Sequence, residues 1–304
     1  MSVRPVKRLL STKPALEGAG VKLQRAFGFG NTTDFDPFLL FDDFRNDNPK
    51  DFLAGFPWHP HRGIETITYV LAGTVEHGDS LGNRGSLGSG DVQWMTAGSG
   101  ILHQEMPKGD PNGRMHGFQL WANLPASLKM TAPRYQDVAA KDIPEIVDDD
   151  GTRVRVVCGD FWGKKGPIEG VAADPRYLDV SVPPGAQKRL PVDRANHAFA
   201  YVFAGSGRFR DASEPRAVRN ELADAPSAAA RSVASDREAG NRSLVLFDAG
   251  DEIVVQAGDE GIRFLLVSGK PIEEPVAWYG PIVMNTDEQL QQAYAELRDG
   301  TFIK

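Results

Sequence analysis

The chain has 304 residues, of which 41% are hydrophobic and 25% are charged, as is typical of a soluble globular protein. Its 34 lysines and arginines against 41 aspartates and glutamates give a net charge of −7, which argues against nucleic acid as a partner. There is no apolar run of about 18 residues and no signal-peptide pattern, and the single cysteine, Cys158, excludes an intrachain disulfide, so we expect a cytoplasmic protein without a membrane span.

Short apolar runs, separated by residues that form turns, make up most of the chain. They are rich in β-branched and aromatic residues, and glycine, proline, asparagine and aspartate lie between them, which is typical of strands. The clearest predicted strands are residues 64–71, 92–96, 117–121, 154–158, 177–182, 197–203, 243–247 and 262–268. The sequence therefore predicts an all-β protein.

Two pairs of metal-binding side chains stand out, each with one residue between its members. His59 and His61 form the first pair, and His103 and Glu105 form the second. Because side chains alternate along a strand, the members of each pair face the same side. If the two strands are neighbours in a barrel, three imidazoles and one carboxylate converge. That set suits a divalent first-row metal such as iron, nickel, copper or manganese.

Other side chains near these pairs have more than one interpretation. Four large apolar residues either line a pocket for a planar aromatic substrate or fill the barrel core: Trp58, Trp94, Met95 and Met106. For Trp94 we prefer the core. Arg62 either binds an anion or caps a turn. His116 is a candidate hydrogen-bond partner of a metal ligand, whereas His77 follows a predicted turn and is expected to be solvated.

Three segments complete the chain. Residues 131–151 contain two prolines and a run of three aspartates, and they are predicted to link two domains. Residues 211–241 lack apolar residues to bury, so they are predicted to be a surface loop or a disordered insertion. Residues 286–297 have acidic residues in the first turn, apolar residues on one face and Gly300 just beyond, which together predict a C-terminal helix.

An internal repeat predicts two barrels of one design. Residues 69–73 and 201–205 both read Tyr-Val-x-Ala-Gly, and we match the later Gly-Asp pairs at 90–91 and 250–251. The barrels would span residues 1–130 and 152–285, with residues 286–304 as helix and tail. The matches place Pro191, Asp193, Arg263 and Leu265 at the positions of the four metal-binding side chains. We therefore predict that the second barrel has no metal site.

The first pair lies in a pattern that resembles the first cupin motif, which here consists of Gly55, His59, His61, Glu65 and Gly73. The second motif departs from the usual cupin, because Thr96 stands in place of a proline and His103 comes two residues late. In a usual cupin the glutamate of the first motif is a ligand. Here Glu105 is better placed than Glu65.

Longer stretches resemble the pirin family closely. These are FPWHPHRGIET at 56–66, QWMTAGSGILHQEMP at 93–107, QLWANL at 119–124 and GPIVMNT at 280–286. The resemblance implies a bicupin, with two jelly-roll-like barrels in tandem and one iron in the N-terminal barrel. It also implies His59, His61, His103 and Glu105 as the ligands. We expect one divalent metal, with Fe(II) preferred over other first-row metals.

Two functions follow from the resemblance. Several pirins are similar to quercetin 2,3-dioxygenase in activity, so the first is a metal-dependent dioxygenase, an oxidoreductase that opens the flavonol ring with O₂. Glu105 would then take the proton of the flavonol 3-hydroxyl, although it could also be a ligand alone. The second is an iron-dependent regulatory protein that docks to a transcription factor or a metabolic enzyme. The intact ligand set argues against a purely structural bicupin, and we expect a monomer.

Overall fold

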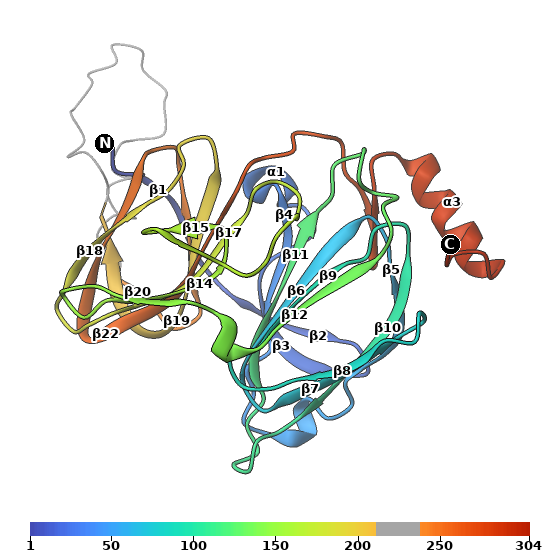
Figure 1. Ribbon diagram of the computed structural model, residues 1–304, viewed down its shortest axis with the longest axis horizontal. Coiled ribbons are helices and arrows are strands. Elements are labelled where there is room, and N and C mark those ends of the chain that lie inside the picture. The colour runs from blue at the N-terminus through green and yellow to red at the C-terminus, as the bar shows by residue number, and fades with distance from the viewer. Residues whose placement is uncertain (211–237) are drawn as a thin grey trace. The chain divides into compact units, whose positions relative to one another are not determined.

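The structure, a computed structural model, describes residues 1–210 and 238–304. The chain divides into two compact units. The first residues of the chain belong to the C-terminal unit, and the last residues belong to the N-terminal unit. The N-terminal unit comprises Lys13–Ile143, Pro167–Asp174 and Pro271–Lys304. The C-terminal unit comprises Met1–Thr12, Pro144–Gly166 and Pro175–Lys270. Both units consist mainly of strands, as the sequence predicts (Figure 1).

Two antiparallel sheets face each other in the N-terminal unit (Figure 1). The larger sheet has the order β12 (Arg134–Val138), β9 (Val92–Thr96), β6 (Ile64–Ala72), β11 (His116–Asn123), β4 (Phe38–Asp43), β3 (Val21–Phe27) and β2 (Lys13–Glu17). The smaller sheet has the order β5 (Phe56–His61), β10 (Ile101–Lys108), β7 (Thr74–Asp79) and β8 (Arg84–Leu87). Short helical turns in this unit are α1 (Thr32–Phe35), η1 (Pro49–Asp51) and η2 (Ala140–Asp142).

The predicted C-terminal helix is confirmed as α3 (Asp287–Arg298). Thr286 and Gln289 form a capping box at its start, which satisfies backbone donors that the first turn leaves open. A hairpin of β23 (Ala277–Tyr279) and β24 (Ile282–Met284) precedes the helix. Residues 271–304 thus belong to the N-terminal unit, although they begin 128 positions after the end of its main part at Ile143.

Within the described residues, the C-terminal unit has one large sheet. Its order is β1 (Val6–Ser11), β21 (Ser243–Phe247), β19 (His197–Phe209), β22 (Glu252–Gly269), β17 (Arg176–Val182), β14 (Arg153–Cys158) and β13 (Glu145–Val147). Further strands are β18 (Gln187–Pro191) on β22, β20 (Ala239–Gly240) on β19, and the hairpin of β15 (Asp160–Phe161) and β16 (Lys164–Lys165). Buried aliphatic and aromatic side chains fill this unit.

The internal repeat is confirmed in its first half, but our match in the second half is wrong. Val70 and Val202 occupy equivalent positions of the repeat, and their carbonyl groups accept hydrogen bonds from the backbone N–H groups of Gly90 and Arg242 respectively. Arg242, and not Gly250, is therefore the counterpart of Gly90. A two-residue Gly-Asp match is too short to fix the register of a strand.

The corrected register changes the counterparts of the metal-binding side chains. Counting from the Ala-Gly turns at 97–98 and 249–250 puts Val255 at the position of His103 and Ala257 at that of Glu105. In the ladders, His103 lies opposite His59, and Val255 lies opposite Lys188. By the same ladders Leu190 replaces His61. The absence of a metal in the second barrel stays a prediction, and it now rests on these four residues.

Two predicted segments differ from the structure. The predicted linker, residues 131–151, contains β12 of one unit and β13 of the other, so it is part of two sheets. The predicted insertion at 211–241 lies outside the described residues up to 237, and its end forms β20, which pairs with β19. Proline and aspartate content at 131–151 suggested a linker but did not reveal the short strands within it.

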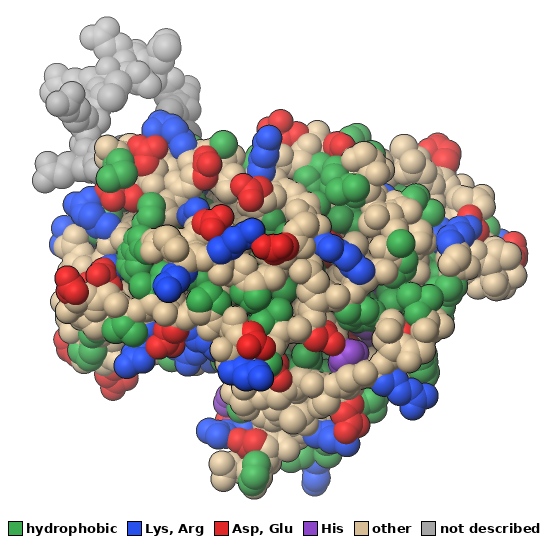
Figure 2. Space-filling model, viewed as in Figure 1, with side chains coloured by type: hydrophobic (Ala, Val, Ile, Leu, Met, Phe, Trp, Pro, Cys, Tyr) green, Lys and Arg blue, Asp and Glu red, His purple; other side chains and the backbone are tan. Residues whose placement is uncertain are grey.

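No helix among the described residues is long and apolar enough to cross a membrane. Cys158 is buried and carries no disulfide, as expected for a small apolar core residue. On the face that Figure 2 shows, basic and acidic side chains are intermixed outside the grey region. That face therefore lacks the basic stripe that is typical of nucleic-acid-binding surfaces.

Candidate metal centre and pocket

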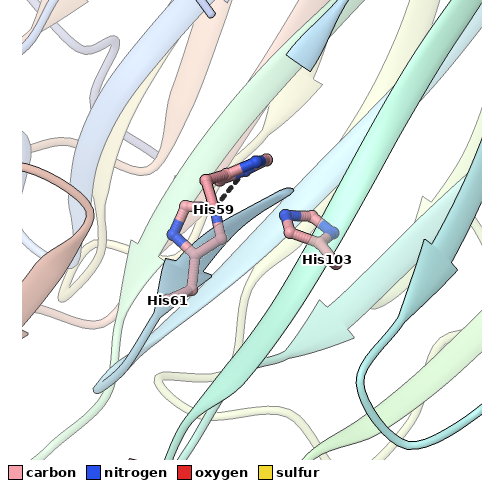
Figure 3. Close-up of side chains that lie close together, drawn as sticks. All are labelled: His59, His61 and His103. Carbon is pink, nitrogen blue, oxygen red and sulfur yellow. Dashed lines mark hydrogen bonds between the residues drawn. The ribbon is translucent and has the colours of Figure 1, made fainter. Parts of the chain in front are cut away.

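Three histidines converge in the N-terminal unit, on neighbouring strands. In the ladder of β5 and β10, His59 lies opposite His103, and His61 follows on the same face of β5. The atoms through which the three could bind a metal all lie within 4.8 Å of one another (Figure 3). The two alternating pairs in the sequence therefore predicted correctly which imidazoles come together.

The hydrogen bonds of the first two histidines fix their tautomers. His59 Nδ1 lies 2.8 Å from the carbonyl oxygen of Pro57, and His61 Nδ1 lies 3.1 Å from that of Pro281. Carbonyl oxygens only accept, so each Nδ1 carries the hydrogen, and a neutral ring then has its lone pair on Nε2. The two Nε2 atoms are 3.1 Å apart, as the dashed line in Figure 3 marks. Two lone pairs this close repel each other unless a metal ion or an additional proton lies between them.

His103 gives a second reason to expect a cation. It is buried, and neither of its ring nitrogens has a hydrogen-bond partner among the described residues. Burial, with the neighbouring imidazoles, holds the pKa values of His61 and His103 well below their ordinary range, so both rings are neutral. Neutral imidazoles with free lone pairs are ligands for a divalent metal. The residues present therefore fit such an ion.

Glu105 lies outside the group of three histidines. Its buried carboxylate accepts hydrogen bonds of 3.3 Å from the Thr68 hydroxyl and from the Gln119 amide. Two donors keep the carboxylate in place as an acceptor. Glu65, the glutamate of the first motif, bonds instead to the Thr96 hydroxyl at 2.7 Å, and it does not line the pocket.

A cavity of about 520 Å³ opens beside the histidines. His59, His61 and Glu105 contribute to its wall, so the candidate metal centre faces the cavity. Most of the remaining wall is apolar and includes Leu40, Phe44, Phe52, Phe56, Trp58 and Trp121. A largely apolar pocket with a few convergent polar groups is the usual form of a small-molecule site.

Among the four apolar residues with two interpretations, the structure distinguishes those that line the pocket from those that do not. Trp58 lines the cavity and is half exposed, so it belongs to the pocket. Trp94 and Met95 are completely buried and belong to the core. Met106 packs beside Gly55 and does not line the cavity.

Arg62 and two further histidines have structural partners. Arg62 is buried and binds an anion of the same chain, because its guanidinium forms an ion pair of 2.8 Å with Glu296. His116 bonds to Asp47 at 2.7 Å and does not line the cavity. The prediction of a solvated His77 is wrong: its ring is buried, with Nε2 3.0 Å from the Gln93 side-chain nitrogen.

Three groups that were not predicted from the sequence shape the site. Thr68 and Gln119 hold Glu105, and the Pro281 carbonyl orients His61. Strand alternation puts Gln119 and Trp121 on one face of β11, which was a usable signal. The role of Pro281 could not be found from local patterns, because it lies 220 positions from His61 in the chain.

A buried lysine holds the segment that carries Pro281. Lys129 Nζ donates to the backbone oxygens of Gly63 and Val283, at 2.9 and 3.0 Å, and to the side chain of Asn123. Gly63 has a φ of +76°, and a Cβ at this position would lie 1.9 Å from the Val283 oxygen, so only glycine allows this close approach. Segment 281–284 is thereby fixed against the residues that follow His61.

Lys129 is expected to make the stability of the protein depend on pH. Burial lowers the pKa of its amine to about 7, from 10.5. Between these values the unfolded chain binds the additional proton, so the free energy of unfolding should rise with pH, by up to about 1.4 kcal/mol per pH unit. Urea unfolding at pH 7.5 and 9 should show this rise in the wild type and in Lys50→Met, an exposed control. If the free energy of unfolding of Lys129→Met rose equally between these pH values, Lys129 would not be the cause of the rise.

The comparisons with known proteins agree with these motifs. Residues 20–122 match the family model Pirin, and residues 177–303 match the model of the pirin C-terminal cupin domain. A pirin-like protein of Caulobacter vibrioides is 43% identical over 303 residues, covering 99% of this chain and 100% of the relative. A Pseudomonas aeruginosa protein provisionally named as a quercetin 2,3-dioxygenase is 40% identical, covering 98% of this chain and 97% of its own.

A solved structure extends the agreement to the fold. The crystal structure of quercetin 2,3-dioxygenase from Acinetobacter baumannii superposes with a TM-score of 0.84 at 28% identity, and 99% of each chain is covered. Two cupin domains and a C-terminal helix, as the sequence predicts, are thus present. With both family models matched and a relative 43% identical along its whole length, the chain belongs to the pirin family.

Proposed function

We propose that this protein is a metal-dependent dioxygenase that opens the ring of a flavonol with O₂. In this proposal His59, His61, His103 and Glu105 hold one divalent metal, with Fe(II) preferred. The observation that carries the proposal is the cavity of about 520 Å³, whose wall includes two of the histidines and Glu105. The names of the relatives from Pseudomonas aeruginosa and Acinetobacter baumannii support the same reaction.

The groups of this chain fit the first step of such a reaction. A flavonol has a 3-hydroxyl next to a 4-carbonyl, and ring opening begins with removal of the hydroxyl proton. Glu105 faces the cavity as a hydrogen-bond acceptor and is the base in this proposal. When bound, the metal would supply Lewis acidity to the substrate oxygens and access to O₂. Apolar walls around Trp58 and Trp121 would hold the rings and exclude water.

The regulatory alternative depends on a different kind of site. A closed metal centre beneath a flat surface would favour docking to a protein partner, whereas an open cavity beside the histidines favours a small substrate. The geometry therefore supports the enzyme better.

Oxygen uptake with quercetin tests the proposal directly. Iron-loaded wild-type protein should consume oxygen in proportion to the quercetin that disappears, and protein treated with a chelator should not. If the iron-loaded protein consumes no oxygen with any flavonol, the enzyme function fails. The regulatory function would then take its place.

A further inference from the structure

A row of polar side chains crosses the inner face of the larger sheet in the N-terminal unit. Adjacent ladders pair Gln93 with Thr68, Thr68 with Gln119, Gln119 with Asp42, and Asp42 with Arg25. Paired residues of neighbouring strands point to the same face of a sheet. Five strands thus contribute one polar side chain each, at one level of a barrel that is otherwise largely apolar inside. We call these five residues the polar row.

Glu105 divides the polar row into two parts. Its carboxylate is held by Thr68 and Gln119 in the middle of the row. On one side of it, Gln93 bonds to His77 and Asp137, outside the cavity. The other side, formed by Asp42 and Arg25, lines the cavity. That part has no function in the reaction described above.

The cavity therefore has two separate groups of polar residues. One surrounds the histidines and Glu105. The other consists of Arg25, Asp42 and Glu17: Arg25 binds both oxygens of Asp42 at 2.8 and 2.7 Å, and it lies 2.8 Å from Glu17. These contacts use the Nε and Nη2 groups of Arg25, and a guanidinium has two further N–H donors on Nη1. Burial raises the pKa of the Asp42 carboxyl to about 6.

The spacing of the two polar groups matches the shape of a planar polyphenol. Neighbouring strands are about 4.8 Å apart, so Asp42 and Arg25 stand about 5 and 10 Å beyond Gln119 along the sheet. Apolar walls, including Leu40 and Phe44, lie around the same cavity. An aromatic molecule that reaches Glu105 at one end would thus place polar substituents of its outer ring at Arg25.

We propose that Arg25, Asp42 and Glu17 form a subsite that binds hydroxyl groups on an outer ring of the substrate. The subsite makes the protein prefer polyhydroxylated flavonols over flavonols without these hydroxyls. This inference rests on the proposed function, since it assigns a substrate class to the same cavity. Carboxylates accept hydrogen bonds from phenolic hydroxyls, and the guanidinium donates hydrogen bonds to them, so a substrate without these hydroxyls would lack these hydrogen bonds.

Two ligands and one pair of variants test the subsite. Quercetin carries hydroxyls on both outer rings, whereas 3-hydroxyflavone keeps only the 3-hydroxyl beside the 4-carbonyl. Their dissociation constants are measured by quenching of tryptophan fluorescence in metal-free protein, and kcat/KM is measured by oxygen uptake after iron loading. Wild-type protein should prefer quercetin in both measurements. Asp42→Asn and Arg25→Gln should each reduce the preference by about 10- to 100-fold, the effect of losing a hydrogen bond to a charged group.

A matched control exists in the C-terminal unit. Arg263 binds both oxygens of Asp179 at 2.9 and 2.6 Å, in the same two-bond geometry, but this pair does not line the cavity. Asp179→Asn should leave the preference for quercetin unchanged, even if it lowers the melting temperature as much as Asp42→Asn does. An unchanged preference in folded Asp42→Asn and Arg25→Gln would overturn the subsite, and so would a failure of both flavonols to bind the wild type.

The two measurements also separate the subsite from the enzyme function. If quercetin binds with the expected preference but no oxygen is consumed, the reaction is wrong and the subsite stands. If oxygen is consumed equally fast with both flavonols, the reaction stands and the subsite is wrong.

Discussion

His103→Ala is expected to abolish stoichiometric metal binding. His103 is buried, and neither ring nitrogen has a hydrogen-bond partner among the described residues, so one nitrogen is available as a metal ligand. Mutation of a residue that only hydrogen-bonds to a metal ligand typically lowers metal affinity by about 10- to 100-fold. Loss of a ligand itself should therefore lower metal affinity by more than about 100-fold. Metal analysis after dialysis, and titration with Fe(II) without oxygen, measure the change.

The control for this variant is His116→Ala. His116 bonds to Asp47 and does not line the cavity, so its loss should leave the metal content at that of the wild type. We expect one metal per chain in the wild type, because Lys188, Leu190, Val255 and Ala257 stand at the corresponding positions of the second barrel. Full metal content in His103→Ala, or two metals per wild-type chain, would contradict the proposed centre.

Glu105→Gln is expected to reduce kcat for quercetin by about 10²- to 10⁴-fold while most of the metal stays bound. The substitution keeps the size of the side chain and an oxygen that can bind a metal, but an amide cannot accept the proton of the 3-hydroxyl. General base catalysis typically contributes a factor of this magnitude. Stopped-flow absorbance of the flavonol, with metal content measured on the same samples, separates the loss of the base from the loss of the metal.

Glu65→Gln is the matched control for Glu105→Gln. Glu65 is also buried and also bonds to a threonine hydroxyl, but it does not line the cavity. The Glu65→Gln substitution should therefore leave kcat for quercetin unchanged. If metal-loaded Glu105→Gln turns over quercetin at the wild-type rate, Glu105 is a ligand only, and the base must be found elsewhere.

Local patterns in the sequence predicted the strands and the three histidines well. Alternation determines which side chains share a face, so His59, His61 and His103 could be assigned to one cluster once their strands were neighbours. The same rule put Glu105 on the face of His103, but the ladder with β5 is irregular between these two residues, and Glu105 lies outside the group of three histidines. Its role as a ligand therefore remains a proposal.

Features that depend on distant parts of the chain could not be predicted in this way. A turn next to His77 suggested exposure, but packing against Tyr135, 58 positions later, buries the ring. The register of the second barrel failed for a related reason, since hydrogen bonds between strands define it and a two-residue match does not. The polar row is a third case, because its five members come from five separate strands.

The order in which the chain is synthesised has a consequence for the metal centre. His59, His61 and His103 leave the ribosome early, but the carbonyl group that orients His61 belongs to Pro281, and Lys129 fixes it through Val283. Nearly 180 residues must be translated between His103 and this last contact. During that interval the nascent N-terminal unit lacks the hairpin and helix that complete it. Full-strength metal binding should therefore begin only after residues 271–304 have emerged, and a nascent chain stalled before Pro271 should hold the metal more weakly.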